Sequence, residues 1–351
     1  MWVAVHGRNR WPPPFGLNAP LIRPMLCANE RHGAHPGPAR EKAAVARPDS
    51  VPALRDALAK VVGAAIEAPG LIRVPLPTPT LPPATTTNHW IVGHRRAVLV
   101  DPATPDRAAL NRLCGLLAAV HQLGTSLRGL FLTHHHDDHV GAALELRRRL
   151  DLPILAHAAT AERLRGRIDV DTEIVDGQVV AEDADGTTWT ALHTPGHAPG
   201  HLVLAHARSG VVVAGDLVAG EGTILIDPRD GRMADYLSSL ARVAALQPTL
   251  LAPAHGPVLS DAVGVLAYYR RHRLQREAKI AAALPPRWIA PDALLPAAYG
   301  DVSRLLWPIA LRSLLAHLEH LRDQGRAAEQ AGQWRAVPGH GDPCGTVEFD
   351  A

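Results

Sequence analysis

This 351-residue chain contains the run T-H-H-H-D-D-H at residues 133–139, which restricts its possible folds more than any other segment. It directly follows the apolar segment G-L-F-L at residues 129–132, which has the composition of a buried strand. A strand that ends in a loop rich in imidazole and carboxylate delivers several metal-binding side chains to one point. The alternating spacing of His134, His136 and Asp138, with His139 adjacent, can divide these donors between two neighbouring ions. The sequence therefore predicts a metal centre at the end of this strand.

The composition is that of a packed protein around such a centre. Hydrophobic residues make up 47% of the chain and charged residues 20%, close to the averages of globular proteins. No apolar run approaches the roughly 18 residues of a membrane span, and the N-terminal region lacks the apolar stretch of a signal peptide. Cys27, Cys114 and Cys344 are far apart and form no C-x-x-C motif, which argues against disulfides and thiolate ligands. We expect a cytoplasmic protein without membrane contact.

The chain divides by composition into four parts. Residues 1–48 are rich in Pro, Arg and Ala without periodicity and are predicted to be an irregular arm. Residues 49–262 begin with a helical stretch at 50–68 and continue with alternating strands and helices, which indicates a layered α/β domain. The predicted strands are 71–74, 90–92, 97–100, 129–132, 154–156, 188–192, 202–205, 211–214 and 250–252. The predicted helices are 107–122, 140–150, 160–164 and 233–246.

Long helical patterns replace the strands after Val263. Pro308 can occupy the first turn of a helix that ends near Gly325. Two β-prone pieces, 327–329 and 333–337, follow it. Helices closed by a hairpin predict a small winged-helix-like domain at residues 263–338, with a C-terminal tail at 339–351.

The histidine run resembles the H-x-H-x-D-H motif of the metallo-β-lactamase superfamily. Three later elements occur in the order that this family has: H-T-P-G-H-A-P-G-H at residues 193–201, V-V-V-A-G-D at 211–216, and A-P-A-H-G-P at 252–257. Each is a weak signal alone, but their order makes the combination specific. The resemblance implies an αβ/βα sandwich with a binuclear metal site at its mouth.

The resemblance also implies the ligands of two ions. One ion would be held by His134, His136 and His197, the second by Asp138, His139 and His255, and Asp216 would bridge them. Zinc is expected, although manganese or iron is compatible with the same donors. Asp101 resembles an early aspartate of the family that orients a ligand, and His193 and His201 are either outer partners of ligands or ordinary loop histidines.

A longer resemblance, over roughly residues 72–337, is to the β-lactamase-like protein 2 group. It depends on G-D-L-V-A-G-E-G-T at 215–223, H-G-P-V-L at 255–259, Y-Y-R-R-H-R-L-Q-R-E at 268–277 and S-L-L-A-H-L at 313–318. Members of this group carry a C-terminal winged-helix-like domain, in agreement with the helices and hairpin above. The resemblance implies relatives that are RNA endonucleases and relatives that are acyl-carrier thioesterases.

Two ions can share a water and lower its pKa to about 7, which predicts a hydrolase that uses a metal-bridging hydroxide, with Asp138 as a catalytic residue. The substrate stays open. RNA is favoured by the whole-chain resemblance and by the basic run 270–276, from which Arg271 and Arg273 are predicted to bind substrate. An acyl thioester or ester, bound to a carrier protein or to coenzyme A, is favoured by the small net charge of +2. A non-catalytic nucleic-acid regulator is the third alternative, which an intact ligand set disfavours. The basic run can also be the solvated or packed face of a helix.

Overall fold

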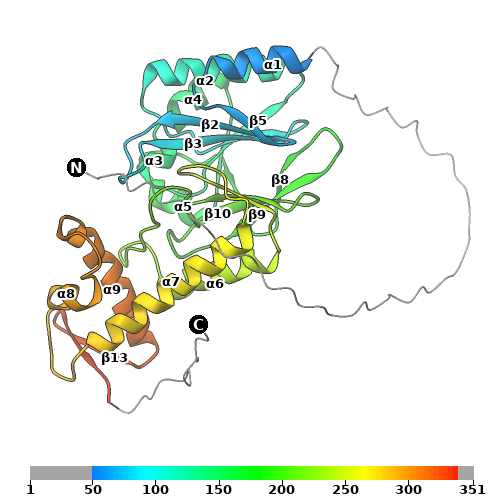
Figure 1. The fold of residues 1–351 in the computed structure, drawn as a ribbon. Coiled ribbons are helices and arrows are strands. Elements are labelled where there is room, and N and C mark those ends of the chain that lie inside the picture. Colours follow the sequence, from blue (N-terminus) through cyan, green and yellow to red (C-terminus); the bar gives the residue numbers. More distant parts are fainter. Residues whose placement is uncertain (1–49, 339–351) are drawn as a thin grey trace, which may run out of the picture. The chain divides into compact units, whose positions relative to one another are not determined.

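The computed structural model describes residues 50–338. The predicted arm at residues 1–48 and the predicted tail at 339–351 lie outside the described residues. Within the described part, two β-sheets face each other and helices cover their outer sides (Figure 1). This is the αβ/βα sandwich that the resemblance implied. None of the helices between residues 50 and 338 combines the length and apolarity that a membrane span requires.

The first sheet has seven strands in sequential order, β1 to β7. Its strands are β1 (Ala65–Ala68), β2 (Leu71–Pro77), β3 (Thr86–Val92), β4 (Ala97–Val100), β5 (Leu127–Phe131), β6 (Ile154–Ala156) and β7 (Thr172–Glu173). Strands β1 to β4 pair antiparallel and β4 to β7 pair parallel. The connections between the parallel strands contain α2 (Arg107–Gln122), α3 (Asp137–Val140), α4 (Ala143–Leu150) and α5 (Ala158–Leu164). Because β4 and β5 are parallel, the residues that follow them meet at the same edge of the sheet.

The second sheet has five strands in the order β12-β11-β10-β9-β8. They are β8 (Val179–Glu182), β9 (Thr188–His193), β10 (Leu202–His206), β11 (Val211–Gly215) and β12 (Leu250–Pro253), and α6 (Met233–Ala245) connects β11 to β12. Strands β11 and β12 are parallel, so the residues after them also emerge together. The two sheets therefore present the ends of four strands around one opening.

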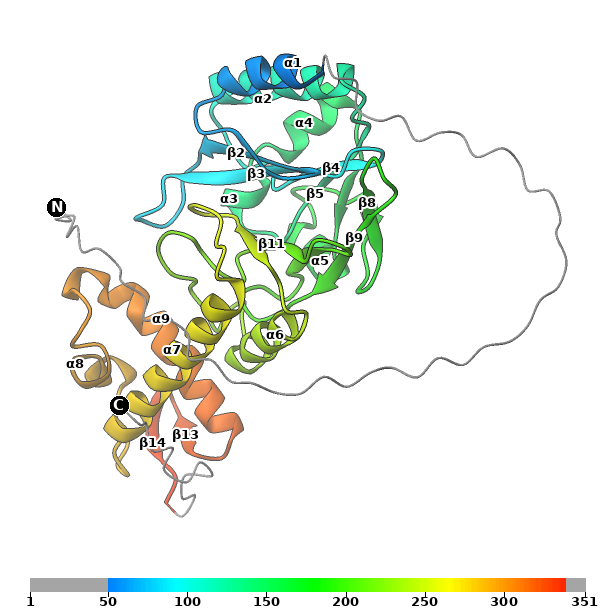
Figure 2. The ribbon, with the colours of Figure 1, turned by 45° about the vertical axis from the view of Figure 1, so that its right-hand side comes forward.

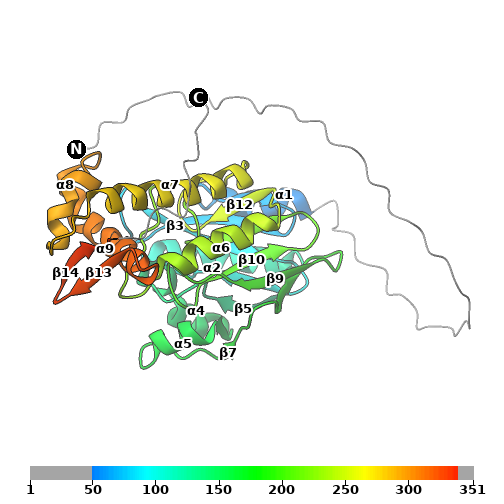
Figure 3. The same cartoon turned by 90° about the horizontal axis from the view of Figure 1, so that it is seen from below.

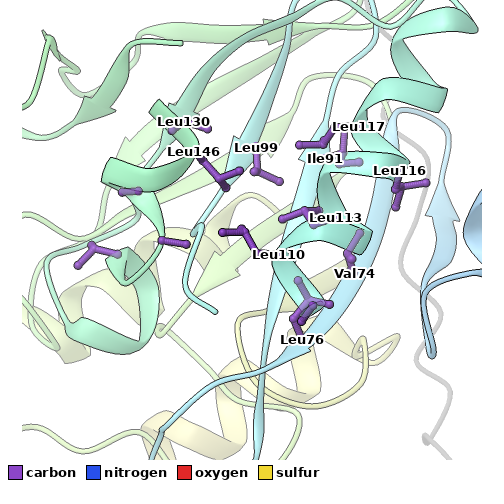
Figure 4. Packing of buried hydrophobic residues seen from close by; sticks show 14 of the residues in the cluster. Val74, Leu76, Ile91, Leu99, Leu110, Leu113, Leu116, Leu117, Leu130 and Leu146 are labelled. Atoms are coloured by element: carbon purple, nitrogen blue, oxygen red, sulfur yellow. The ribbon is translucent and has the colours of Figure 1, made fainter. Parts of the chain in front are cut away.

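Apolar packing holds the layers together. A cluster that includes Trp90, Phe131 and Trp189 fills the space between the sheets. Outside the first sheet, α1 (Ser50–Ala59), α2 and α4 bury leucines against it (Figure 4). In α2, Leu110, Leu113 and Leu117 recur at the spacing of one helical face, and the N-cap side chain of Asp106 accepts from the backbone N–H of Ala109.

The C-terminal part contains α7 (Ala262–Ala283), the 3₁₀ turn η1 (Pro291–Leu294), α8 (Leu295–Ala298), the 3₁₀ turn η2 (Arg304–Leu306), α9 (Trp307–Asp323), β13 (Ala327–Gln330) and β14 (Gln333–Ala336). Pro308 lies in the first turn of α9, as the sequence predicts. The 22-residue helix α7 belongs to both halves of the molecule. Leu266 and Tyr269 pack with α6, whereas Ile280 and Leu284 pack in the core of the helices and hairpin. Figures 2 and 3 show α7 running from beside α6 to the part that contains α8 and α9. The winged-helix part is thus joined to the sandwich by a continuous helix.

Three sequence predictions need correction. The predicted helix at 50–68 ends at Ala59, and residues 65–68 form β1 after Gly63, which adopts a φ of +78° that ends helical structure. The predicted helix at 140–150 is divided, because Gly141 and Ala142 separate α3 from α4. Strands β7 and β8 were not predicted. Both residues of β7 are exposed, so the strand shows no apolar pattern.

Candidate metal centre

Seven predicted ligand residues lie together at the opening between the sheets. The loop after β5 and the short helix α3 supply His134, His136, Asp138 and His139. The loop after β9 supplies His197, and the residues after β11 and β12 supply Asp216 and His255. Their side chains form overlapping groups whose nitrogen and oxygen atoms lie within 4.8 Å of one another, a spacing that can hold metal ions. The predicted residues from these four loops are therefore neighbours in space.

The first group consists of three imidazoles. Nε2 of His134 lies 2.9 Å from Nδ1 of His136 and 3.2 Å from Nε2 of His197. The third distance, from Nε2 of His197 to Nδ1 of His136, is 3.0 Å. Three ring nitrogens so close to one another share one centre.

Outer partners determine which nitrogen of each ring carries the proton. Nδ1 of His197 lies 2.8 Å from the carbonyl oxygen of Leu225, which can only accept. Nε2 of His136 lies 2.7 Å from a carboxylate oxygen of Asp230. Nδ1 of His134 lies 3.0 Å from Oγ1 of Thr133, whose own hydrogen is donated to Asp101. Each ring therefore donates outward and directs a lone pair at the shared centre, an arrangement that a cation satisfies and that neighbouring imidazoles cannot satisfy among themselves.

The second group repeats this arrangement. Nδ1 of His139 donates to Asp101 at 2.8 Å, and Nδ1 of His255 donates to the carbonyl oxygen of Thr86 at 3.1 Å. In the neutral form of each ring, Nε2 would therefore carry a lone pair for a cation, and Nε2 of His139 is buried without a hydrogen-bond partner in the described chain. The carboxylate of Asp138 lies 3.8 Å from Nε2 of His139 and 3.6 Å from Nε2 of His255. A second cation would fit these donors.

Asp216 lies between the two groups. Its Oδ2 is 3.4 Å from Nε2 of His197, and its Oδ1 is 3.6 Å from Nε2 of His139 and 3.5 Å from Nε2 of His255. His201 orients this residue, because its Nε2 accepts from the backbone N–H of Asp216 at 3.0 Å. The preceding Gly215 has a φ of +49°, and a side chain there would meet His201 at 2.6 Å. The local chain thus holds one carboxylate in reach of both groups.

Asp101 orients residues of both groups through hydrogen bonds that its carboxylate accepts. It is almost completely buried and adopts a φ of +49°, a conformation that is uncommon outside glycine. Its carboxylate accepts from the backbone N–H and hydroxyl of Thr133 and from Nδ1 of His139. The structure thus places Asp101 in the orienting position that the resemblance implied.

Burial and charge set the protonation of the centre. Burial lowers the pKa of His197 to about 4 and the pKa of His134 well below its usual value, which keeps both rings neutral near pH 7. Burial also acts to lower the pKa of His139, but the carboxylates of Asp101, Asp216 and Asp138 outweigh it and raise this pKa. Burial acts to raise the pKa of Asp216, but the imidazoles of His139 and His255 hold it well below its usual range. The same negative field favours cations in the second group.

A cavity of about 490 Å³ opens onto these residues. Three arginines line it, and each is paired with an aspartate: Arg229 and Arg312 with Asp227, and Arg163 with Asp230 at 3.4 Å. Arg312 comes from α9, so the winged-helix part borders the cavity directly. These residues were not predicted, because no motif marks them and the pair Arg312–Asp227 spans 85 positions in the sequence.

Asp230 was also not predicted from the sequence. It accepts from Nε2 of His136 and lies 3.0 Å from Nε2 of His135. Asp230 follows Asp227 in a short turn, D-P-R-D-G, that carries no recognisable motif, and His136 is 94 residues away. His135 thus lines the cavity beside Asp230 and does not belong to the group of three imidazoles. The adjacent Asp137 is exposed and pairs with Arg167 at the surface.

The structure places Arg271 and Arg273 away from the metal cavity. Arg271 is exposed on α7 and does not line the cavity. Arg273 is 5% exposed, donates to the carbonyl oxygen of Ile224, and lies over the ring of Tyr236. The prediction that this pair would face the mouth needs correction, because charge alone does not reveal which side of a helix packs. Arg276 is also buried and pairs with Asp301.

Comparisons with known proteins agree with this geometry. Residues 81–255 match the model of the metallo-beta-lactamase superfamily, and residues 290–334 match the beta-lactamase associated winged helix domain. The chain is 28% identical over 253 residues to a beta-lactamase-like protein 2 homolog of Drosophila melanogaster, covering 68% of this chain and 83% of that protein.

Two further relatives have names that describe an activity. The chain is 36% identical over 180 residues to a hydroxyacylglutathione hydrolase of Acidiphilium cryptum, covering 49% of this chain and 65% of that protein. It is 30% identical over 200 residues to an atrochrysone carboxyl ACP thioesterase of Aspergillus chevalieri, covering 56% of this chain and 60% of that protein. The chain thus spans less than two thirds of either protein.

A solved structure shows the same fold. A metallo-beta-lactamase family protein from Thermus thermophilus superposes with a TM-score of 0.63 at 25% identity, covering 78% of this chain and 100% of that one. The fold, the order of the motifs and both family matches lead to one conclusion: the chain belongs to the metallo-β-lactamase superfamily and is a hydrolase with a C-terminal winged helix domain of the associated type.

Proposed function

We propose that the protein is a binuclear, zinc-dependent hydrolase of acyl thioesters or esters. The observation that carries the proposal is the set of ring nitrogens whose protons point outward and whose lone pairs converge on two centres, with Asp216 between them. One ion would be held by His134, His136 and His197, and the other by Asp138, His139 and His255. When bound, two divalent ions would polarise the acyl carbonyl and acidify a water between them.

The chain's own residues would orient this chemistry. Asp230, Thr133 and the carbonyl of Leu225 fix the rings of the first group, so each presents the nitrogen that binds a cation. Oδ2 of Asp138 accepts from the hydroxyl of Thr80 at 2.5 Å, which fixes its carboxylate at the floor of the cavity. Asp138 is then positioned to accept a proton from a water that attacks the acyl carbon.

The metal cavity favours an acyl substrate over RNA. Its lining contains no phenylalanine, tyrosine or tryptophan from the described residues on which nucleobases could stack. Each of its three arginines is already paired with a carboxylate, so the mouth is not the strongly basic groove that a polyanion needs. The hydroxyacylglutathione hydrolase and the thioesterase among the relatives both act, by their names, on thioesters. A preference for acyl substrates therefore replaces the preference for RNA that the sequence suggested.

A parallel assay tests this proposal. Zinc-loaded protein is incubated with acetyl and octanoyl thioesters and, separately, with a labelled single-stranded RNA oligomer, and each reaction is repeated after dialysis against a chelator. We expect thioester hydrolysis that is abolished by the chelator and restored by zinc. Metal-dependent cleavage of RNA without thioester hydrolysis would contradict the proposed substrate, and turnover that survives chelation would contradict the metal mechanism.

A further inference from the structure

A second cavity of about 350 Å³ lies beside the metal cavity. The two cavities share residues 81–82 and 222–225 in their linings, so these residues lie between them and form the wall that divides them. The second cavity does not include any of the predicted metal ligands. Its volume is in the range of pockets that hold small molecules.

Hydrogen bonds to backbone carbonyls hold this wall on both sides. The carbonyl oxygen of Leu225 accepts from Nδ1 of His197 on the metal side. The carbonyl oxygen of the preceding Ile224 accepts from the guanidinium of Arg273 on the other side. A molecule that spans the wall would therefore have one end at the metal centre and the other beside α7.

The far side of the second cavity is built by the helices of the C-terminal part. Tyr268 and Tyr269 come from α7, Tyr299 follows α8, and Ile309 and Ala310 come from α9. Aromatic and aliphatic side chains form most of this lining, in contrast to the polar metal cavity. Covering such a surface with an apolar group is favourable, because both apolar surfaces leave water.

We propose that the second cavity binds the acyl group of the substrate, an aliphatic chain. This assignment rests on the proposed thioesterase function, because the scissile carbonyl would lie at the metal centre while the chain crosses beside the wall. The winged-helix part would then select the length of the acyl chain. Ile309 would be a specificity-determining residue.

A series of thioesters tests the assignment. Acetyl, butyryl, hexanoyl and octanoyl esters of the same thiol are compared in wild type, in Ile309→Trp and in the control Leu274→Trp. Leu274 is on α7, is 38% exposed and lines neither cavity. We expect kcat/KM of wild type to rise at least about 100-fold from acetyl to octanoyl, since each buried methylene contributes about fourfold.

The two substitutions should act differently. Ile309→Trp fills the cavity and should lower kcat/KM for the octanoyl ester at least about tenfold while leaving the acetyl ester within about twofold. Leu274→Trp should change neither value.

The outcomes separate this inference from the proposed function. Metal-dependent turnover that does not rise with chain length, or that Ile309→Trp leaves unchanged for octanoyl, would overturn the acyl pocket and leave the thioesterase proposal intact. If no thioester is hydrolysed, calorimetric titration with octanoate tests binding in the second cavity independently of turnover. Binding that Ile309→Trp weakens would support the pocket, and no binding to wild type would overturn it.

Discussion

Replacing Asp216 with alanine is expected to remove both metal ions and to lower turnover by at least about 10³-fold, or roughly 4 kcal/mol of activation free energy. Asp216 is the side chain with an oxygen atom near each group, at 3.4 Å from His197 and at 3.6 and 3.5 Å from His139 and His255. Its loss takes a ligand from both ions and removes negative charge from between them. Elemental analysis after gel filtration should show less than one equivalent of metal.

A stability measurement separates metal loss from misfolding. Binding of metal to the folded state raises the melting temperature of wild type, so a chelator should lower it. Asp216→Ala should melt near the temperature of chelated wild type and should not respond to the chelator. A variant that retains two equivalents of metal would contradict the bridging role of Asp216.

Replacing Asp138 with alanine is expected to lower turnover by about 10²- to 10⁴-fold while most of the metal remains. Its carboxylate is at the cavity floor, held by Thr80, whereas His139, His255 and Asp216 would still hold the second ion. We therefore expect the variant to lose its proton acceptor and to keep most of the second ion. Metal content and kcat, measured on the same preparation, test this difference.

Asp137→Ala is the matched control for this substitution. Asp137 precedes Asp138 in the same helix, but its side chain is 81% exposed and pairs with Arg167 at the surface. It should keep wild-type kcat and metal content. Turnover of Asp138→Ala close to that of wild type, on any substrate that wild type hydrolyses, would contradict the assigned role.

The predicted ligands could be found from the sequence because each lies in a local motif at a strand end. His134 to His139 follow β5 directly, and Asp216 and His255 follow β11 and β12. Parallel pairing brings the ends of β11 and β12 together, and the resemblance of the ordered motifs to those of the family implied that all of these residues share one site. Asp230 and Arg312 act on this site through contacts that span 94 and 85 positions, and such contacts leave no local pattern.

The fold was predictable wherever burial left an apolar pattern. Strand β4 and helix α2 match their predicted bounds because their buried residues form an uninterrupted run and one helical face, respectively. Strand β7 is exposed at both residues and carries no such pattern. Helix α1 was predicted too long, because the apolar residues that continue past Ala59 belong to β1, which pairs with β2.

The basic run on α7 shows that charge alone does not predict whether an arginine is exposed or buried. Arg271 is exposed, whereas Arg273 and Arg276 are buried by packing and by hydrogen bonds to backbone carbonyls. Arginine can bury its apolar stem and satisfy its head group locally, so a cluster of arginines does not by itself indicate a polyanion site. In this chain Arg273 and Arg276 instead line the second cavity.

Anomalous diffraction from crystals of the zinc-loaded protein, recorded above and below the zinc absorption edge, tests the binuclear centre most directly. We expect two zinc peaks about 3.5–4 Å apart. One should lie among Nε2 of His134, Nδ1 of His136 and Nε2 of His197, the other beside Nε2 of His139 and His255, with Asp216 between them. A single peak in crystals grown with excess zinc, or peaks away from these nitrogens, would contradict it.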